Sequence, residues 1–303
     1  MHIHPTLDTA SRVSTYTRID QEDFYWLIGI LEGEGTFLAG PPSSPRNPVV
    51  RVAMTDRDVI DRVGVLFNRS VLSLRAREAH HKPPLVTTIK GTPAVEVMRK
   101  IRPLMGQRRQ RQIDQAIASW HGGPARRDRG GTADRPAEFA SNLRADATPV
   151  DELAIHWLAG LLEGEATFGL HRDSRVNVYP IIQLKMCDED VVRRAAGMLG
   201  APSVRAYAPK NENWSLVYVM SLFGHVAGTW MRRLRPLMGQ RRAATIDAAL
   251  EAYQPIRLIA APATCVVSNC AEPHRSRGLC HKHYMMWSRD RAIGREQRIT
   301  PLR

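Results

Sequence analysis

The segment WLIGILEGEGTF, at residues 26–37, returns as WLAGLLEGEATF at residues 157–168, displaced by 131 positions. A second block, RPLMGQRR at residues 102–109, returns unchanged at residues 235–242, displaced by 133 positions. Between them, MTDRDVI at residues 54–60 matches MCDEDVV at residues 186–192, displaced by 132 positions. Three blocks in one order at nearly one displacement indicate a tandem duplication of a unit of about a hundred residues.

Each copy has the pattern of a helix, two strands, a helix, two more strands and further helical segments. Helical periodicity covers residues 56–67 and 188–199, and also runs through 94–120 and 225–252. Strand alternation in 176–186 places five residues on a largely polar face: Asn177, Tyr179, Ile181, Gln183 and Lys185. In 72–77 the same reasoning predicts Leu72, Leu74 and Ala76 inward and Ser73, Arg75 and Arg77 outward. We therefore expect antiparallel sheets with helices on one side and a solvated face on the other.

The repeats also predict the domain boundaries. We expect a polar leader at 1–19, a first unit at 20–120, a linker at 121–149, a second unit at 150–256 and a basic tail at 257–303.

Composition narrows the class of protein. The 303 residues carry a formal net charge of +13, which favours a polyanionic partner. A hydrophobic fraction of 43% excludes a disordered basic protein, and four cysteines are too few for a disulfide scaffold. The first twenty residues lack a secretory signal and no apolar run reaches the roughly 20 residues of a membrane span, so a soluble, cytoplasmic protein is expected.

Two glycines stand four residues apart in each repeated helix, Gly29 with Gly33 and Gly160 with Gly164. This spacing places them on one helix face, where another backbone can approach closely. The simplest partner for each helix is its own copy, and such packing would bring Glu34 and Glu165 together at two negative helix ends. Two carboxylates there repel each other unless a cation is nearby, and oxygen ligands of this kind suit Mg²⁺.

The segments LIGILEGEG and LAGLLEGEA resemble the signature of the LAGLIDADG homing endonucleases, in the single-chain, two-motif form. The resemblance covers about residues 22–252. It implies an α+β fold of tandem αββαββα units with pseudo-twofold symmetry, whose sheets form a saddle over double-stranded DNA. It also implies a monomeric, sequence-specific, Mg²⁺-dependent endonuclease, with Glu34 and Glu165 as the catalytic and metal-binding acids.

The resemblance extends to residues around the acids and on the sheets. Lys90 resembles the basic residue that the family places beside the active sites, whereas Leu222-Phe223-Gly224 in the second copy has no lysine, so the two half-sites are expected to differ. Outward strand residues are the expected DNA contacts, because Arg and Lys pair with guanine edges and Asn or Gln with adenine. They are Arg51, Arg75, Arg77, Asn177, Gln183, Lys185 and Arg205.

Several alternatives stay open at this stage. The repeated Gln-Arg-Arg at 107–109 and 240–242 either contacts phosphate or is a solvated helix start. A phosphate loop at 33–35 is disfavoured because no helix follows it, and Glu32 and Glu163 are expected to be structural or capping residues rather than second metal ligands. The rival function is a non-cleaving binder of the same fold, an RNA maturase or a regulator. An intein is disfavoured because no splicing block flanks the repeats.

The tail contains Cys265-x4-Cys270-x9-Cys280-x2-His283, with His274 and His281 as alternative fourth ligands. Thiolates and an imidazole in tight pairs are typical of structural Zn²⁺, which can fold a segment with little core. Cys187 lies outside this group and is expected to be buried. Residues 257–303 hold nine Lys+Arg against three Asp+Glu and resemble small zinc knuckles of mobile-element and phage nucleases, so we expect a second DNA contact.

Overall fold

The computed structural model describes residues 19–44, 47–76, 78, 80, 82–118, 120, 150–172, 178–208, 214–253 and 262–302. The predicted linker and nearly all of the predicted leader lie outside these residues, as do two of the predicted DNA contacts, Arg77 and Asn177. The chain divides into two compact units, Met1–Ala252 and Tyr253–Arg303. No helix in the described part of the chain is long and apolar enough to cross a membrane.

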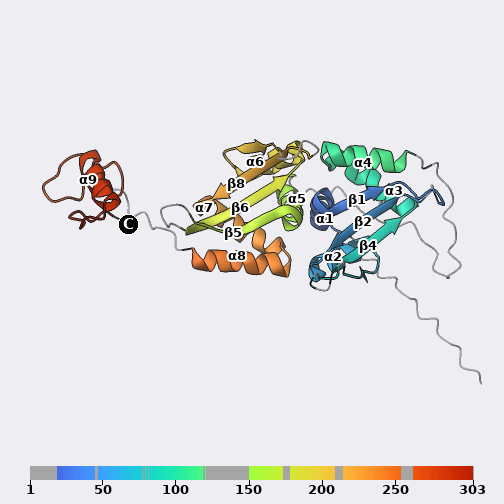
Figure 1. Cartoon of the computed structure of the whole chain (residues 1–303). Helices are drawn as coiled ribbons and strands as arrows, with labels where there is room; N and C mark the ends of the chain where they lie inside the picture. Colours follow the sequence, from blue (N-terminus) through green and yellow to red (C-terminus); the bar gives the residue numbers. More distant parts are fainter. Residues whose placement is uncertain are drawn as a thin grey trace, which may run out of the picture. The chain divides into compact units, whose positions relative to one another are not determined.

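The two repeats have the same order of elements (Figure 1). The first contains α1 (Gln21–Glu34), β1 (Gly35–Leu38), β2 (Val49–Met54), α2 (Arg57–Phe67), β3 (Leu72–Ser73), β4 (Leu85–Lys90), α3 (Thr92–Ile101), the 3₁₀ helix η1 (Arg102–Leu104) and α4 (Gln107–Ile117). The second contains α5 (Val150–Glu165), β5 (Ala166–Arg172), β6 (Val178–Met186), α6 (Glu189–Leu199), β7 (Val204–Tyr207), β8 (Val217–Phe223), α7 (Gly224–Leu234), η2 (Arg235–Leu237) and α8 (Gln240–Ala252). The predicted tandem αββαββα architecture is confirmed, with a 3₁₀ helix and one further α-helix at the end of each repeat.

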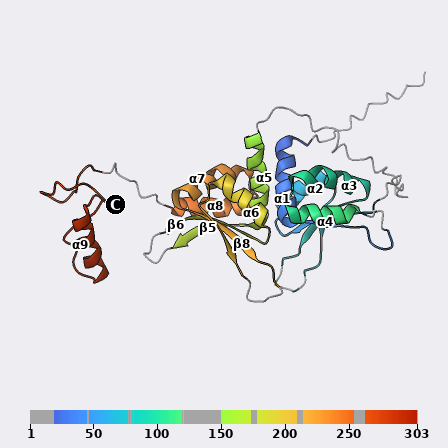
Figure 2. The same ribbon diagram turned by 90° about the horizontal axis from the view of Figure 1, so that it is seen from above.

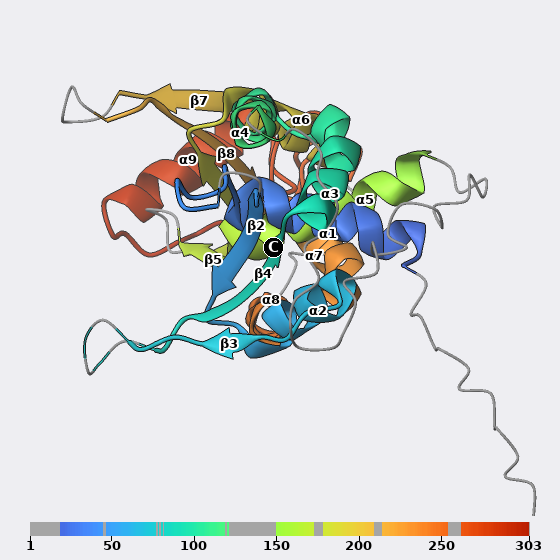
Figure 3. The same cartoon turned by 90° about the vertical axis from the view of Figure 1, so that its right-hand side faces the viewer.

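Each repeat forms a four-stranded antiparallel sheet, in the order β1-β2-β4-β3 or β5-β6-β8-β7. The short strands β3 and β7 form the edges that lie far apart in Figure 3. Helices of both repeats cover the same side of the two sheets, which leaves one face of each sheet without a helix (Figure 2). We call these the outer faces.

The burial pattern along β6 agrees with the predicted alternation. Ile182, Leu184 and Met186 are buried under the helices, whereas Gln183 and Lys185 belong to the outer face. The two-residue period of a strand separates the sets in this way.

The prediction that Leu72 and Leu74 face inward was wrong. Leu72 pairs with Val86, which belongs to the outer face, and Ser73 pairs with Leu85 on the helix side. Leu72 is 63% exposed. Because the side-chain period of a strand is two, an assignment displaced by one residue sends every side chain to the opposite face.

The two repeats share one hydrophobic core, in which α1 and α5 lie side by side (Figure 1). A Cβ atom on Gly29 would lie 2.6 Å from the backbone N of Leu161, and one on Gly160 would lie 2.9 Å from the backbone N of Ile30. Only glycine permits backbones to approach this closely. The predicted packing of each glycine-spaced helix against its own copy is therefore confirmed.

The second unit is small, and its described residues are 262–302 together with Tyr253. It contains α9 (His281–Ala292) and two isolated β-bridges, Thr264 with Pro273 and Ser276 with Leu279. Its buried cluster consists of Cys265, Leu279, Cys280 and Trp287. So small a core gives little hydrophobic stabilisation, and units of this size commonly depend on a metal or on disulfides.

Candidate functional site

Glu34 ends α1 and Glu165 ends α5, and the side chain of each glutamate lies against the other helix. A Cβ atom on Gly33 would lie 2.8 Å from Glu165 Cγ, and one on Gly164 would lie 3.0 Å from Glu34 Cγ. Each carboxylate therefore stands against the last turn of the other helix. The second glycine of each motif is required because a side chain at that position would occupy the place of the opposing glutamate.

Both carboxyl groups are partly withdrawn from water. Burial, followed by repulsion from Glu165, raises the pKa of Glu34 to about 6. Burial likewise raises the pKa of Glu165, although nearby arginines oppose the rise. Two such carboxylates at the negative ends of two helices form a set of oxygen donors that attracts a cation.

Glu32 and Glu163 precede these acids by two residues and have a structural role. The backbone N–H of Gly106 donates to Glu32 Oε2 at 2.7 Å, and that of Gly239 donates to Glu163 Oε2 at 2.7 Å. Both carboxyl groups are buried, and burial raises the pKa of Glu32 to about 7. Each carboxylate caps the start of α4 or α8. The predicted capping role is confirmed.

The last arginine of each Gln-Arg-Arg block binds the end of its own motif helix. Arg109 is buried; its Nε donates to the Glu32 carbonyl at 2.8 Å, and its Nη2 donates to the Gly33 carbonyl. Arg242 makes the equivalent bonds to the Glu163 carbonyl at 3.1 Å and to the Gly164 carbonyl at 3.4 Å. Carbonyls at a helix end lack partners within the helix, and these guanidinium groups satisfy them. Both earlier interpretations of the blocks, a phosphate contact and a solvated helix start, are wrong for these two arginines.

The preceding arginine of each block reaches the other repeat. Arg108 forms a two-bond ion pair with Asp188, with both distances at 2.6 Å, and Arg241 forms one with Asp56 at 2.7 and 2.6 Å. The two aspartates precede α6 and α2 directly. Arg108 is close enough to Glu165 to stabilise its charged form. Sequence reasoning missed these pairs, although both the Arg-Arg and the Asp-x-Asp pattern recur at the repeat displacement.

The backbones of the same blocks also join the repeats. The N–H of Gln107 donates to Asp190 Oδ2 at 2.7 Å, and the N–H of Gln240 donates to Asp58 Oδ2 at 2.6 Å. The starts of α4 and α8 are therefore each bound by the opposite repeat, and the site around the two glutamates is assembled from both.

Four of the predicted DNA contacts lie on the outer faces. Arg51 stands between Thr36 and Thr88 in the first sheet. Lys185 and Arg205 flank Val219 in the second sheet, and Gln183 donates to Ser221 Oγ at 3.0 Å. Arg75 is exposed but lies beyond the end of β3. The outer faces thus carry cations and amides that do not pack under the helices.

Lys90 ends β4, three residues in the sheet register from the strand pair next to Glu34, and its role beside the acids stays a prediction. Gly35, directly after Glu34, pairs with Val52, whereas the exposed Lys90 pairs with Val49 three residues farther along the strand. Three residues correspond to about 10 Å along a strand. The cations near the acids include Arg108, Arg109 and Arg242 of the repeated blocks, for which the sequence predicted other roles.

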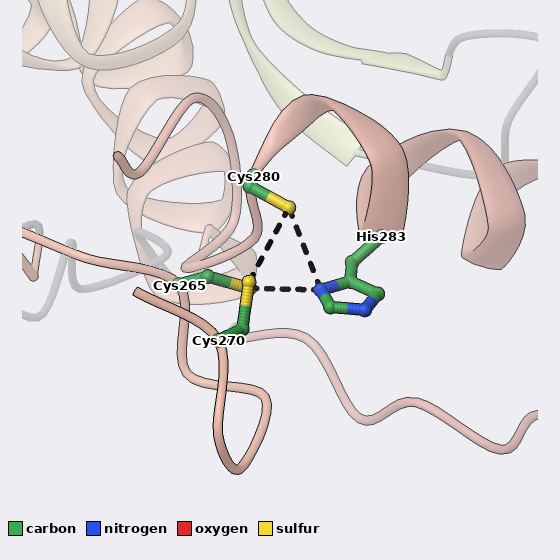
Figure 4. A group of neighbouring side chains, drawn as sticks. All are labelled: Cys265, Cys270, Cys280 and His283. Carbon is green, nitrogen blue, oxygen red and sulfur yellow. Dashed lines mark hydrogen bonds between the residues drawn. The ribbon is translucent and has the colours of Figure 1, made fainter. Parts of the chain in front are cut away.

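The second unit holds a group of four potential metal ligands (Figure 4). The ligand atoms of Cys265, Cys270, Cys280 and His283 all lie within 4.8 Å of one another. Cys270 and Cys280 sulfurs are 3.9 Å apart, and His283 Nδ1 lies 3.2 Å from Cys265 Sγ and 3.4 Å from Cys280 Sγ. Tetrahedral Zn²⁺, with Zn–S bonds of about 2.3 Å, separates two sulfurs by about 3.8 Å. The donor set fits this ion.

Two other features of the cysteines are relevant. Burial opposes ionisation of the Cys265 thiol. Hydrogen bonds from the backbone N–H groups of Cys280 and Val267 nevertheless contribute to lowering the pKa of this thiol to about 6. The lowered pKa favours the thiolate, which is the form that binds metals. Cys187, expected to be buried, is exposed. It directly follows the end of β6, where the strand no longer alternates between core and solvent.

Comparisons with known proteins gave structural matches only. No family model matches the chain, and no curated protein matches it. The LAGLIDADG meganuclease I-AabMI, solved with uncleaved DNA, is 14% identical, with a TM-score of 0.45 and coverage of 75% of this chain and 89% of that one. The LAGLIDADG homing endonuclease I-GzeII, in complex with its DNA target, is 10% identical, with a TM-score of 0.42 and coverage of 77% and 99%. The LAGLIDADG homing endonuclease I-LtrWI, bound to target DNA, is 11% identical, with a TM-score of 0.40 and coverage of 77% and 98%.

Proposed function

We propose that the chain is a sequence-specific endonuclease that cleaves both strands of duplex DNA in the presence of Mg²⁺. The observation that carries this proposal is the convergence of Glu34 and Glu165 at the ends of two closely packed helices. One acid for each strand is the arrangement that a double-strand break requires. The formal net charge of +13 supports a nucleic acid as the substrate.

Glu34 and Glu165 would hold the Mg²⁺. When bound, such a metal activates water and stabilises charge on the leaving oxygen. Arg108 adds positive charge near Glu165, and Arg241 forms the equivalent ion pair in the other repeat. Their side chains are 40% and 50% exposed, so each guanidinium can be held by its aspartate and still present N–H groups to a phosphate.

The outer faces supply the surface for the rest of the target. Arg51, Gln183, Lys185 and Arg205 stand there without a covering helix. A two-stranded or larger antiparallel sheet can enter the major groove, where each base pair presents its own pattern of donors and acceptors. The two sheets differ in sequence, so the target is expected to be long and asymmetric.

Cleavage of a random duplex library tests the proposal. We expect the full chain to enrich one site in Mg²⁺, Glu34→Gln and Glu165→Gln to lose double-strand cleavage of that site, and each single variant to leave nicked circles. Glu152→Gln, an exposed acid on the same helix α5, is the matched control and should cleave normally. Absence of cleavage by the wild-type chain, with specific binding retained, would replace the proposal with a non-cleaving DNA- or RNA-binding function.

We also propose that Cys265, Cys270, Cys280 and His283 hold one structural Zn²⁺. The four donor atoms lie within 4.8 Å of one another, which supports their binding a single tetrahedral ion. Metal analysis of the purified chain should give one zinc per molecule, and Co²⁺ in its place should show the visible absorption of thiolate coordination. The variant Cys280→Ser should bind less metal, and an unchanged zinc content in that variant would contradict this assignment.

A further inference from the structure

The outer face of the second sheet is divided into two zones. Near α5 it is polar and charged, with the Gln183–Ser221 hydrogen bond and Lys185. At the ends of β5 and β6 that lie away from α5 (Figure 1), the outer face carries three aromatic rings, one each from the adjacent strands β5, β6 and β8.

The three rings form one cluster. The ring of His171 lies 5.4 Å from that of Tyr179 and 5.4 Å from that of Phe223, and Tyr179 meets Phe223 edge to face at 6.1 Å. Such edge-on contacts are favourable and fix the orientation of the rings.

The cluster is not part of the core. Phe223 is 45% exposed, and it pairs with Ile181 on the side of the sheet that no helix covers. His171 is exposed as well. An ordered apolar patch that remains open to water is a typical mark of a binding surface.

Among the described residues of the first sheet, the position equivalent to Phe223 carries a different kind of side chain. In the second sheet, Gly169 pairs with Ile181, which in turn pairs with Phe223. In the first sheet, Leu38 pairs with Val49, which in turn pairs with Lys90. Phe223 therefore occupies the position in the second sheet that Lys90 occupies in the first. The same point of the two outer faces presents an aromatic ring in one repeat and an ammonium group in the other.

We propose that the cluster of His171, Tyr179 and Phe223 contacts thymine methyl groups in the part of the target under the second sheet. This proposal rests on the proposed function. The C5 methyl of thymine is the one apolar group that the bases present in the major groove, and aromatic side chains contact it. Lys185 and Arg205, in the zone nearer α5, favour the phosphate backbone.

The register also places the contact along the DNA. The pair Ala166–Leu184 stands next to Glu165. Along β5, the pair Gly169–Ile181 lies three residues farther out, and the pair His171–Tyr179 lies five residues farther out. A strand rises about 3.3 Å per residue and duplex DNA about 3.4 Å per base pair. The thymines are thus expected roughly three to five base pairs outward from the phosphate beside Glu165.

Uracil substitution isolates the methyl group, because uracil keeps the pairing edge of thymine and lacks only that group. The site is first selected from a random duplex library by binding to the zinc-loaded full chain without Mg²⁺. Thymines in the second-sheet half are then replaced by uracil one at a time, and the same replacements are made at the equivalent distance in the other half. We expect a loss of about fourfold in affinity for each contacted methyl in the first set and no change in the second.

The exchange variant Phe223→Lys, which installs the first repeat's residue, tests the assignment to this ring. We expect its affinities for thymine and uracil sites to become nearly equal, with only a small fall in the melting temperature because the half-exposed side chain loses two ring contacts. Lys90→Phe is the converse variant and should acquire a uracil effect in the other half.

The outcomes separate the two proposals. A library without an enriched site would overturn both. An enriched site that has no thymine in the stated interval, or one whose binding uracil leaves unchanged, would overturn the aromatic contact alone. Wild-type sensitivity to uracil that persists in Phe223→Lys would overturn the role of Phe223.

Discussion

Replacing Gly29 by alanine tests the close approach of α1 and α5, on which the position of both glutamates depends. The added Cβ would collide with the backbone oxygen of Trp157 and would also stand 2.6 Å from the backbone N of Leu161, whereas ordinary contact begins at 3.4 Å. The obstacle is backbone, which cannot rotate aside as a side chain can. The two helices must therefore separate.

The expected loss of stability follows from two opposing contributions. Overpacking in a core costs about 1–3 kcal/mol, and a gap of 0.5–1 Å between helices forfeits a quarter to a half of each contact energy. Alanine returns about 1 kcal/mol through its higher helix propensity. We expect a net loss of about 2 kcal/mol, which corresponds to a fall in the melting temperature of about 4–8 °C for a unit of this size.

The assay is thermal unfolding followed by circular dichroism, with Gly197→Ala as the matched control. Gly197 is also a glycine inside a helix, but a Cβ there would meet nothing within 4 Å. That variant should gain about 0.5–1 kcal/mol from helix propensity alone. If Gly29→Ala raised the melting temperature as the control does, the helices would not be in contact at this point and the convergence of the glutamates would lose its basis.

Three further outcomes are expected. Arg109→Ala should lower the free energy of unfolding by about 1–3 kcal/mol in urea titrations, because it leaves two buried carbonyls without donors, whereas the exposed Arg111→Ala on the same helix should change little. The hydrogen bonds from Arg241 lower the pKa of Asp56, so the stability from this pair is fully present above about pH 4 and is lost as the pH falls through the lowered pKa. The variant Arg241→Gln should therefore weaken the dependence of unfolding on acid pH. An identical pH profile in that variant would contradict the assignment. Chelation of zinc should abolish the helical signal of α9 and leave the melting of the first unit unchanged, and a retained α9 signal would show that this unit folds without metal.

The sequence predicted the parts of the site that depend on short-range patterns. The glycine pairs, with spacing of four, indicated the packing of α1 against α5, and the acids at the ends of these helices followed from their position. The alternation predicted the outer face of β6 correctly because burial alternates along the eight residues 179–186. In β3 only two residues are paired, so the same method had too little pattern to fix the face and chose the wrong one.

The ion pairs around the site could not be predicted in this way. Arg241 and Asp56 are 185 residues apart, and Arg108 and Asp188 are 80 residues apart. Their contacts depend on how the repeats are joined, which no local periodicity encodes. Lys90 was assigned by its resemblance to a family residue; the register sets it three residues from the strand pair next to Glu34, and its role stays a prediction.

The crossed pairs, Arg108 with Asp188 and Arg241 with Asp56, are each other's image under exchange of the repeats. They are the self-complementary contacts that a symmetric dimer would make. A connecting segment between two such partners contributes mainly by raising the concentration of one half near the other. A fragment that ends before residue 121 and a fragment that begins after residue 149 should accordingly associate when mixed. If removal of a charge from one fragment weakens this association, only a compensating change in the other fragment should restore it.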